Sequence, residues 1–264
     1  MAEKVHRGDM GGGVRARCAA VSAGSRDEKR ENMRVQRIRF SLAALCCVVS
    51  SLAVGQENVV VHSDGSAASS GLIVASDTDM VETRRPGKFS GIEVDTSADV
   101  SFAVGSDSLV TVTGPANVVP LVKTQVQDGV LRVRLEHSVT MSRPLKVVIV
   151  GPTLQAVSIR GSATMKASNL NEDALSIGIS GSGTVSASGS VKEVRVAISG
   201  SGDVHVSDIH AKTLVASIKG SGNIQAYAAD SAVVELSGSG DIKVRGNPAH
   251  RIVNRSGSGD VQFD

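Results

Sequence analysis

A glycine-serine triplet that recurs about every nineteen residues constrains the fold of this chain more than any other feature. The six triplets begin at Gly161, Gly181, Gly200, Gly220, Gly238 and Gly257, at intervals of 20, 19, 20, 18 and 19 residues. The first reads Gly-Ser-Ala, and the other five read Gly-Ser-Gly. A fixed period of this length is typical of repeat proteins whose coils stack on one another.

Apolar and polar residues alternate within each period. Val194, Val196 and Ile198 share one parity, and the outward parity holds polar residues such as Ser199. Period-two alternation predicts strands with one buried face. Identical coils stacked in register form parallel sheets, whose crossovers are right-handed because strands twist. We therefore predict an all-β fold, a right-handed parallel β-helix (β-solenoid) of ~19-residue Gly-Ser-Gly coils.

The triplet glycines share the parity of the buried residues. We expect them to point inward and to remove side chains where the wall of the coil bends. The predicted structural repeat positions are Gly161, Gly181, Gly183, Gly200, Gly202, Gly220, Gly222, Gly238, Gly240, Gly257 and Gly259.

Residues 33–55 have the pattern of a signal peptide. A basic segment from Met33 to Arg39 precedes the apolar run 40–49, and Ala53 and Gly55 are small residues suited to cleavage before Gln56. The run is too short for a transmembrane span. We predict that Met33 is the initiator and that residues 1–32 are an upstream extension; a long basic leader is the alternative.

The three cysteines, Cys18, Cys46 and Cys47, all precede the predicted cleavage site. The mature chain is therefore expected to need no disulfide, and lipidation at Cys46 or Cys47 is the alternative to simple cleavage. Residues 1–55 hold ten Lys/Arg and five Asp/Glu, which leaves 18 against 21 in the rest. A mildly acidic body with few aromatic residues is not expected to bind nucleic acid.

The remainder divides into a linker and one β domain. Residues 56–88 are rich in Ser, Ala and Gly or carry Arg-Arg-Pro-Gly, which predicts a flexible linker. Residues 89–264 form the predicted solenoid, with regular repeats over 161–264. Short alternating strands over 89–160 predict wider first coils that cap the stack, and a separate small sandwich is the alternative.

The sequence from Phe89 resembles a known family. The motif comprises Phe89-x-x-Ile92-x-Val94, a Val-x-Val-x-Gly-Pro segment at 110–115, Asp128-Gly129-x-Leu131, and the serial Gly-Ser-Gly motifs. It is similar to the DUF2807 family of putative auto-transporter adhesin head domains, or GIN domains, over about residues 89–264. The resemblance implies a right-handed β-helix in an exported protein of Gram-negative bacteria, and it supplies no catalytic residues.

One column of polar residues is a candidate cation site. Asp203, Asn223, Asp241 and Asp260 follow successive triplets, and oxygen ligands in a row can hold calcium. Thr164 and Thr184 hold the same place in the earlier coils, and Asn223 interrupts the acids. We therefore favour a solvated turn column that satisfies backbone groups, with no metal and no cofactor. No pattern of catalytic residues stands out. We therefore predict a non-enzymatic, adhesin-like scaffold for a protein or glycan ligand at the cell envelope, with a carbohydrate-active β-helix enzyme as the alternative.

The sixth coil departs from the repeat. Arg255 occupies the place that Ile179, Ile198, Ile218 and Leu236 hold in earlier coils. An inward charge is one way in which proteins limit stacking at a sheet edge. Val261 and Phe263 nevertheless keep the inward parity, so we expect this end to be covered by a second copy of the chain, in a closed homo-oligomer.

Overall fold

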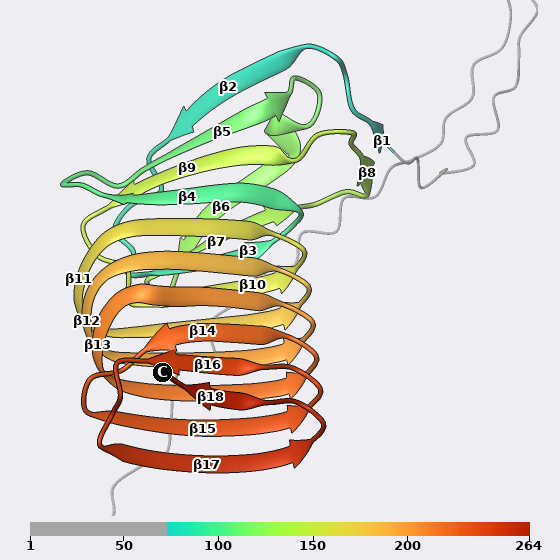
Figure 1. Cartoon of the computed structure of the whole chain (residues 1–264). Coiled ribbons are helices and arrows are strands. Elements are labelled where there is room, and N and C mark those ends of the chain that lie inside the picture. Colours follow the sequence, from blue (N-terminus) through green and yellow to red (C-terminus); the bar gives the residue numbers. More distant parts are fainter. Residues whose placement is uncertain (1–72) are drawn as a thin grey trace, which may run out of the picture. The chain divides into compact units, whose positions relative to one another are not determined.

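The computed structural model describes residues 73–264, which form a β-solenoid of about five turns (Figure 1). The predicted extension 1–32, the signal peptide 33–55 and part of the predicted linker lie outside the described residues. The regular coils comprise β10 (Ala156–Gly161), β11 (Thr164–Gly181), β12 (Thr184–Gly200), β13 (Asp203–Gly220), β14 (Asn223–Tyr227), β15 (Ser231–Gly238), β16 (Ile242–Arg245), β17 (His250–Gly257) and β18 (Val261–Phe263). All neighbouring pairs among them are parallel, which confirms the predicted β-helix.

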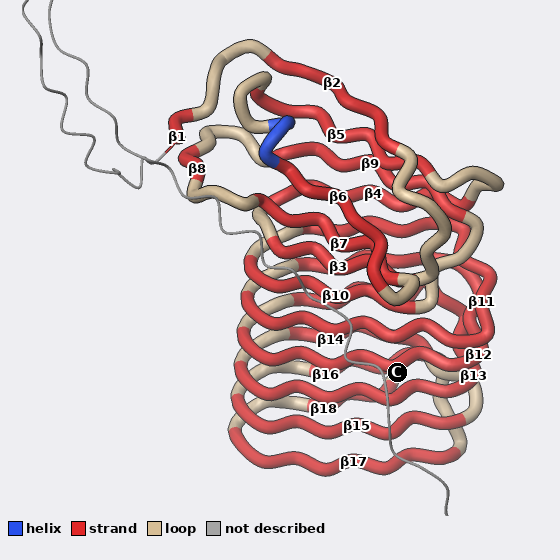
Figure 2. The backbone as a smooth tube through the Cα atoms, turned by 180° about the vertical axis from the view of Figure 1, so that it is seen from behind, coloured by secondary structure: helices blue, strands red, loops and turns tan. Residues whose placement is uncertain are grey.

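The triplets set the register of the stack. Gly181 pairs with Gly161 and Gly200, and the same column continues to Gly257. Strand segments that end at a triplet form one side of the solenoid, called wall 1 here (β10, the second parts of β11–β13, β15 and β17). Segments that follow a triplet form wall 2 (the first parts of β11–β13, β14, β16 and β18). Figure 2 shows the coils stacked in this way from behind.

The core lies between the two walls and is aliphatic. Ile179, Ile198, Ile218 and Leu236 form one column and are at most 2% exposed. Burial of each such side chain stabilises the fold by about 1.5–3 kcal/mol. The alternation of the sequence therefore places its apolar residues in the interior as expected.

The two glycines of a triplet have different tasks. Gly202 is buried as predicted, and a Cβ there would lie 2.6 Å from Cγ2 of Ile179. Gly200 is only half-buried and has a φ of +129°, and a Cβ there would lie 2.4 Å from the carbonyl oxygen of Gly181 in the coil before. Glycine is therefore needed at the first position because the backbone there is left-handed and because the adjacent coil leaves no room for a Cβ. The prediction that it points inward is wrong, because the chain already turns there.

The N-terminal part adds coils in an order that does not follow the sequence. Its strands are β3 (Gly91–Asp95), β4 (Ala98–Val104), β5 (Leu109–Pro115), β6 (Val122–Gln127), β7 (Val130–Leu135), β8 (Val139–Thr140) and β9 (Leu145–Gly151), with a short 3-10 helix, η1 (Val119–Leu121). Strands β3 and β4 pair with β10 and β11, and β7 and β9 pair with the opposite edges of β3 and β4.

The ends of this region depart from coil geometry. Strand β6 runs antiparallel to β7, and β5 runs antiparallel to β9. Residues 89–160 are therefore coils only at β3, β4, β7, β9 and β10, and β5 and β6 are antiparallel additions that the sequence did not predict. Buried residues from Phe89 to Val244 belong to one continuous hydrophobic core, so this region is packed on the coils.

The predicted linker 56–88 contains two strands, so the prediction of a flexible segment is wrong for them. Strand β1 (Ile73–Val74) pairs with β8, and β2 (Asp79–Arg84) pairs antiparallel with β5. The local composition resembles a linker, but the partner strands lie far along the chain. Pairing with a preformed sheet edge outweighs weak local preference in such a case.

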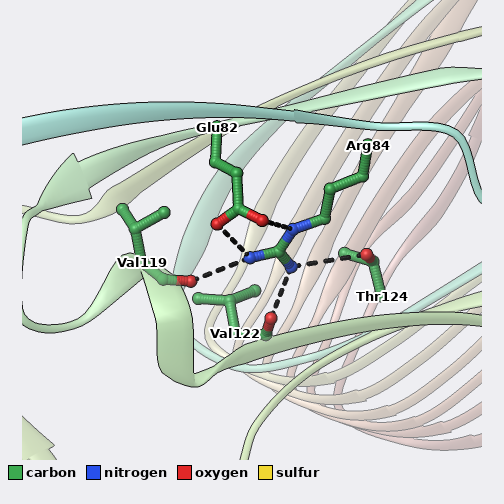
Figure 3. A network of polar contacts seen from close by, with 5 residues as sticks. All are labelled: Glu82, Arg84, Val119, Val122 and Thr124. Carbon is green, nitrogen blue, oxygen red and sulfur yellow. Dashed lines mark hydrogen bonds and ion pairs between the residues drawn. The ribbon is translucent and has the colours of Figure 1, made fainter.

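A single arginine anchors β2 (Figure 3). Nη2 of Arg84 lies 2.8 Å from Oε2 of Glu82 and donates to the carbonyl oxygen of Val119 at 3.0 Å. Nη1 donates to the carbonyl oxygen of Val122 and, at 3.4 Å, to the hydroxyl of Thr124. The hydrogen bond from Arg84 lowers the pKa of Glu82. These contacts join β2 to η1 and β6.

The last coil is open to solvent. Every residue of β17 is exposed, including Arg255, which pairs in register with Leu236. Nη1 of Arg255 donates to the carbonyl oxygen of Gly259 at 3.2 Å, and the guanidinium of Arg251 lies 4.6 Å from the ring centre of Phe263. Two arginine side chains thus lie between β17 and β18 at this end. Its coverage by a second copy stays a prediction.

Candidate functional site

The outer faces of the two walls carry the polar side chains that can meet a ligand. Each rung of the solenoid contributes every second residue to the outside, and adjacent rungs are about 4.8 Å apart. Residues at equal distance from the triplet therefore form straight columns. The corner at the triplet is exposed at Ser182, Ser201, Ser221, Ser239 and Ser258.

The four residues of the candidate cation column lie one above another on wall 2 and are joined by hydrogen bonds. Asn223 donates from Nδ2 to Oδ1 of Asp203 at 2.8 Å and accepts the backbone N–H of Asp241 at 3.2 Å. Oδ1 of Asp241 in turn accepts the backbone N–H of Asp260 at 2.9 Å. The four residues form a ladder, in which the side chains of Asn223 and Asp241 satisfy backbone N–H groups of the next coil.

The ladder engages oxygens that a cation would need. Within residues 73–264 no group of three or more His, Cys, Asp or Glu side chains is placed to hold a metal ion. The side chain of Gln262 donates to Asp260 at 2.9 Å and is the main cause of a lowered pKa at that carboxyl. These hydrogen bonds are the ones that the turn-column interpretation predicts, and the absence of a metal stays a prediction.

Two columns of wall 2 border a shallow groove, called the acidic groove here. It has a volume of about 400 Å³ and includes the ladder residues. The other side of the groove is the neighbouring column of outward-facing residues, two positions further along each strand: His205, Gln225, Lys243 and Gln262. Lys243 is paired with Asp264 at 2.7 Å.

Wall 1 carries a second depression, called the serine trough here. It has a volume of about 330 Å³ and lies over four successive rungs, β10 to β13. One column contributes Arg160, Ser180, Ser199 and Lys219, and the column beside it contributes Ser158, Gly178, Ala197 and Ser217. Gly178 has no side chain and Ala197 has only a methyl group, which leaves space beside Ser180 and Ser199.

A carboxylate shared by three arginines adjoins the trough. Among the described residues, Glu93 is the one charged residue that is buried. Its oxygens lie 3.3 Å from Nη1 of Arg160, 3.5 Å from Nη2 of Arg134 and 3.9 Å from Nε of Arg132. Nε of Arg132 is itself buried without a hydrogen-bond partner. One carboxylate therefore neutralises a guanidinium cluster incompletely.

Neither the trough nor the arginine cluster was predicted from the sequence. The predicted candidate column follows each triplet, whereas the trough column precedes each one, at Arg160, Ser180, Ser199 and Lys219. Alignment of the sequence on its triplets would have found that column. The cluster at Glu93 gave no such signal, because β7, β3 and β10 are neighbours only in the folded chain.

Comparison with known proteins places these features in a family. The family model of the putative auto-transporter adhesin, head GIN domain (DUF2807), matches residues 88–248. No match was found among curated proteins. Among residues 73–264, no helix is long and apolar enough to cross a membrane.

Several solved structures are similar to this chain at low sequence identity, and the first of them shares its fold. A putative adhesin from Bacteroides fragilis is 20% identical, with a TM-score of 0.61, over 73% of this chain and 100% of its own. A putative lipid binding protein from Parabacteroides distasonis is 17% identical, with a TM-score of 0.48, over 74% and 100%. A putative adhesin from Parabacteroides merdae is 18% identical, with a TM-score of 0.47, over 73% and 98%. With its family model matched over most of its length, this chain belongs to the DUF2807 family of adhesin head GIN domains.

Proposed function

We propose that this chain is exported and acts at the cell envelope as a non-enzymatic scaffold that binds a glycan or protein ligand on the outer walls of its solenoid. The chain is adhesin-like by family and by fold. The observation that carries the proposal is the pair of polar depressions on opposite walls, the acidic groove and the serine trough.

The solenoid suits recognition because its outward side chains stand on hydrogen-bonded strands. Rigid strands hold contact residues in fixed positions, so binding orders few additional groups. The columns also repeat the same contact at each rung, which fits a ligand that is itself extended and repetitive. Short hydroxyl side chains such as Ser180 and Ser199 offer hydrogen bonds at low conformational cost.

A carbohydrate-active enzyme is the second candidate, and one observation favours it. Asp241 and Asp260 lie on adjacent rungs of the acidic groove, about 5 Å apart by strand spacing, which resembles the carboxyl separation in retaining glycosidases. A general acid, however, needs a raised pKa at neutral pH. The pKa of Asp260 is lowered, and Asp241 is engaged in the ladder. The scaffold therefore fits these side chains better.

Two experiments test the proposal. Fractionation of cells with N-terminal sequencing tests export, and we expect a mature terminus near Gln56; retention in the cytoplasm would refute it. Binding of the purified protein to immobilised glycans and envelope proteins, followed by product analysis, tests the rest. We expect binding with the ligand recovered intact. Turnover that disappears in Asp241→Asn would establish the enzyme instead.

A further inference from the structure

The charges of the serine trough select the sign of its ligand. Arg160 and Lys219 are the two charged residues among those that line it, and both are cations. Both side chains are exposed, and they stand in one column with Ser180 and Ser199 between them. A ligand that fills this depression therefore meets a cation at both ends, and the nearest carboxylates in register, Glu93 and exposed Glu235, lie on the rungs beyond the lining.

The arginine cluster beside the trough adds to this field. Arg132, Arg134 and Arg160 share the buried carboxylate of Glu93, and exposed Asp95 stands between Arg134 and Arg160 in register. Three guanidinium groups against two carboxylates leave one positive charge. Arg160 makes a single ion pair, through Nη1, so other N–H groups on its fork remain for a ligand anion.

The spacing of the two cations limits the shape of the ligand. Arg160 and Lys219 are three rungs apart, which corresponds to about 14 Å at the usual distance between strands. A single small anion cannot contact both. An extended chain with anionic groups at intervals can do so, and its intermediate units would lie over Gly178 and Ala197.

The lining favours a saccharide over other polyanions. Four serine hydroxyls, at Ser158, Ser180, Ser199 and Ser217, border the trough and can exchange hydrogen bonds with sugar hydroxyls. No aromatic side chain lines it, whereas single-stranded nucleic acid is generally bound by stacking of its bases on aromatic rings. Carboxylates on two of the sugars are enough to pair with the two cations, and the hydroxyls of the sugars between them can reach the serines.

We propose that the serine trough binds an extended acidic polysaccharide, with Arg160 and Lys219 contacting carboxylates of two sugars about three residues apart. This inference rests on the proposed scaffold function and gives it a ligand class and a place. Ser180 and Ser199 contact the sugars between these two, and Gly178 and Ala197 admit the rings close to the sheet.

The test measures the affinity of the whole protein for oligogalacturonates of increasing length by calorimetry. Arg160→Gln and Lys219→Gln are each expected to weaken binding on the order of ten-fold, the value of one charge-assisted contact. Lys166→Gln removes the same charge from wall 2 and should leave the affinity unchanged. A disaccharide, too short to contact both cations, should bind weakly, and each single variant should weaken its binding less than that of the longer oligomers.

Ala197 allows charge to be separated from shape. The residue is exposed, so Ala197→Glu and Ala197→Gln should both fold and place side chains of similar size in the trough. We expect Ala197→Glu to weaken oligogalacturonate binding at least several-fold more than Ala197→Gln, with the difference decreasing as salt is added. Circular dichroism on all variants checks the fold.

Several results would overturn the inference. The first is an equal effect of the two Ala197 variants on oligogalacturonate binding. The second is an affinity that is unchanged in Arg160→Gln and Lys219→Gln. The third is tighter binding of inorganic polyphosphate or single-stranded DNA than of oligogalacturonate. Binding of a neutral glycan or a protein that resists every trough variant would refute the trough site and leave the scaffold function intact. Absence of any ligand across the glycan and protein panels would count against the scaffold function itself.

Discussion

Substitution of one triplet glycine tests whether contact between coils fixes the positions of the repeat. Gly200→Ala and Gly161→Ala are the informative pair. Both residues have a positive φ, +129° at Gly200 and +100° at Gly161, which an alanine rarely adopts. Strain of this kind costs about 1–3 kcal/mol, and it applies to both variants.

The two sites differ in what a new methyl group meets. At Gly161, where the column of first glycines begins, a Cβ would have nothing within 4 Å. At Gly200 it would lie 2.4 Å from the carbonyl oxygen of Gly181, which accepts the backbone N–H of Ser201 at 2.9 Å. The coils must separate locally, and the bond from Ser221 to the carbonyl of Gly200 is disturbed as well.

The magnitude follows from the bonds involved. Two backbone hydrogen bonds at about 1 kcal/mol each make Gly200→Ala about 2 kcal/mol more destabilising than Gly161→Ala. Urea denaturation followed by circular dichroism measures the difference in the free energy of unfolding. Equal losses in the two variants would show that backbone strain alone requires glycine at the first position of the triplet, and that the stacking argument is wrong.

Three further predictions concern the core, the ladder and the last coil. Ile198→Asp buries a carboxylate and is expected to cost several kcal/mol, whereas Ser201→Ala should cost under about 1 kcal/mol; equal shifts in thermal denaturation would refute the assigned parity. Asn223→Asp adds a carboxylate to the ladder. Like charges raise carboxyl pKa values in the folded state, so this variant should lose up to about 1 kcal/mol at neutral pH and regain it as the pH falls to about 4, in urea titrations at both values. Arg255→Leu extends the aliphatic column beyond Leu236 and should increase self-association in light scattering; an unchanged mass would show that the arginine does not limit stacking.

The regular coils could be predicted because their information is local and repeated. Ile179, Ile198 and Ile218 are all buried because they have the same place in the period-two alternation before a triplet. Each copy of the triplet marks the same turn. Register within the coils follows once the triplets are aligned. The same alignment places Asp203, Asn223, Asp241 and Asp260 in one column, so the ladder on wall 2 was also within reach of the sequence.

The N-terminal region could not be predicted to the same degree. No local sequence pattern shows that β7 pairs with β3 and β9 with β4 at the edges away from the regular coils. None shows that β2 is a strand anchored by Arg84. These arrangements depend on pairings between segments far apart in the sequence. Without a repeat, several registers have similar local preference, and packing of the whole sheet selects among them.

The coil, its period and its buried face follow from the sequence pattern, because glycine at a tight corner and alternating aliphatic residues act through neighbouring backbone and solvent. The chemistry of the outer walls arises only when the strands pair. Arg160 and Lys219 belong to one trough because three rungs of parallel pairing bring them into a column, and Glu93 meets three arginines from two other strands because β3 is inserted between β7 and β10. Charge acts through space, so its pattern becomes a site only after the strands have been paired.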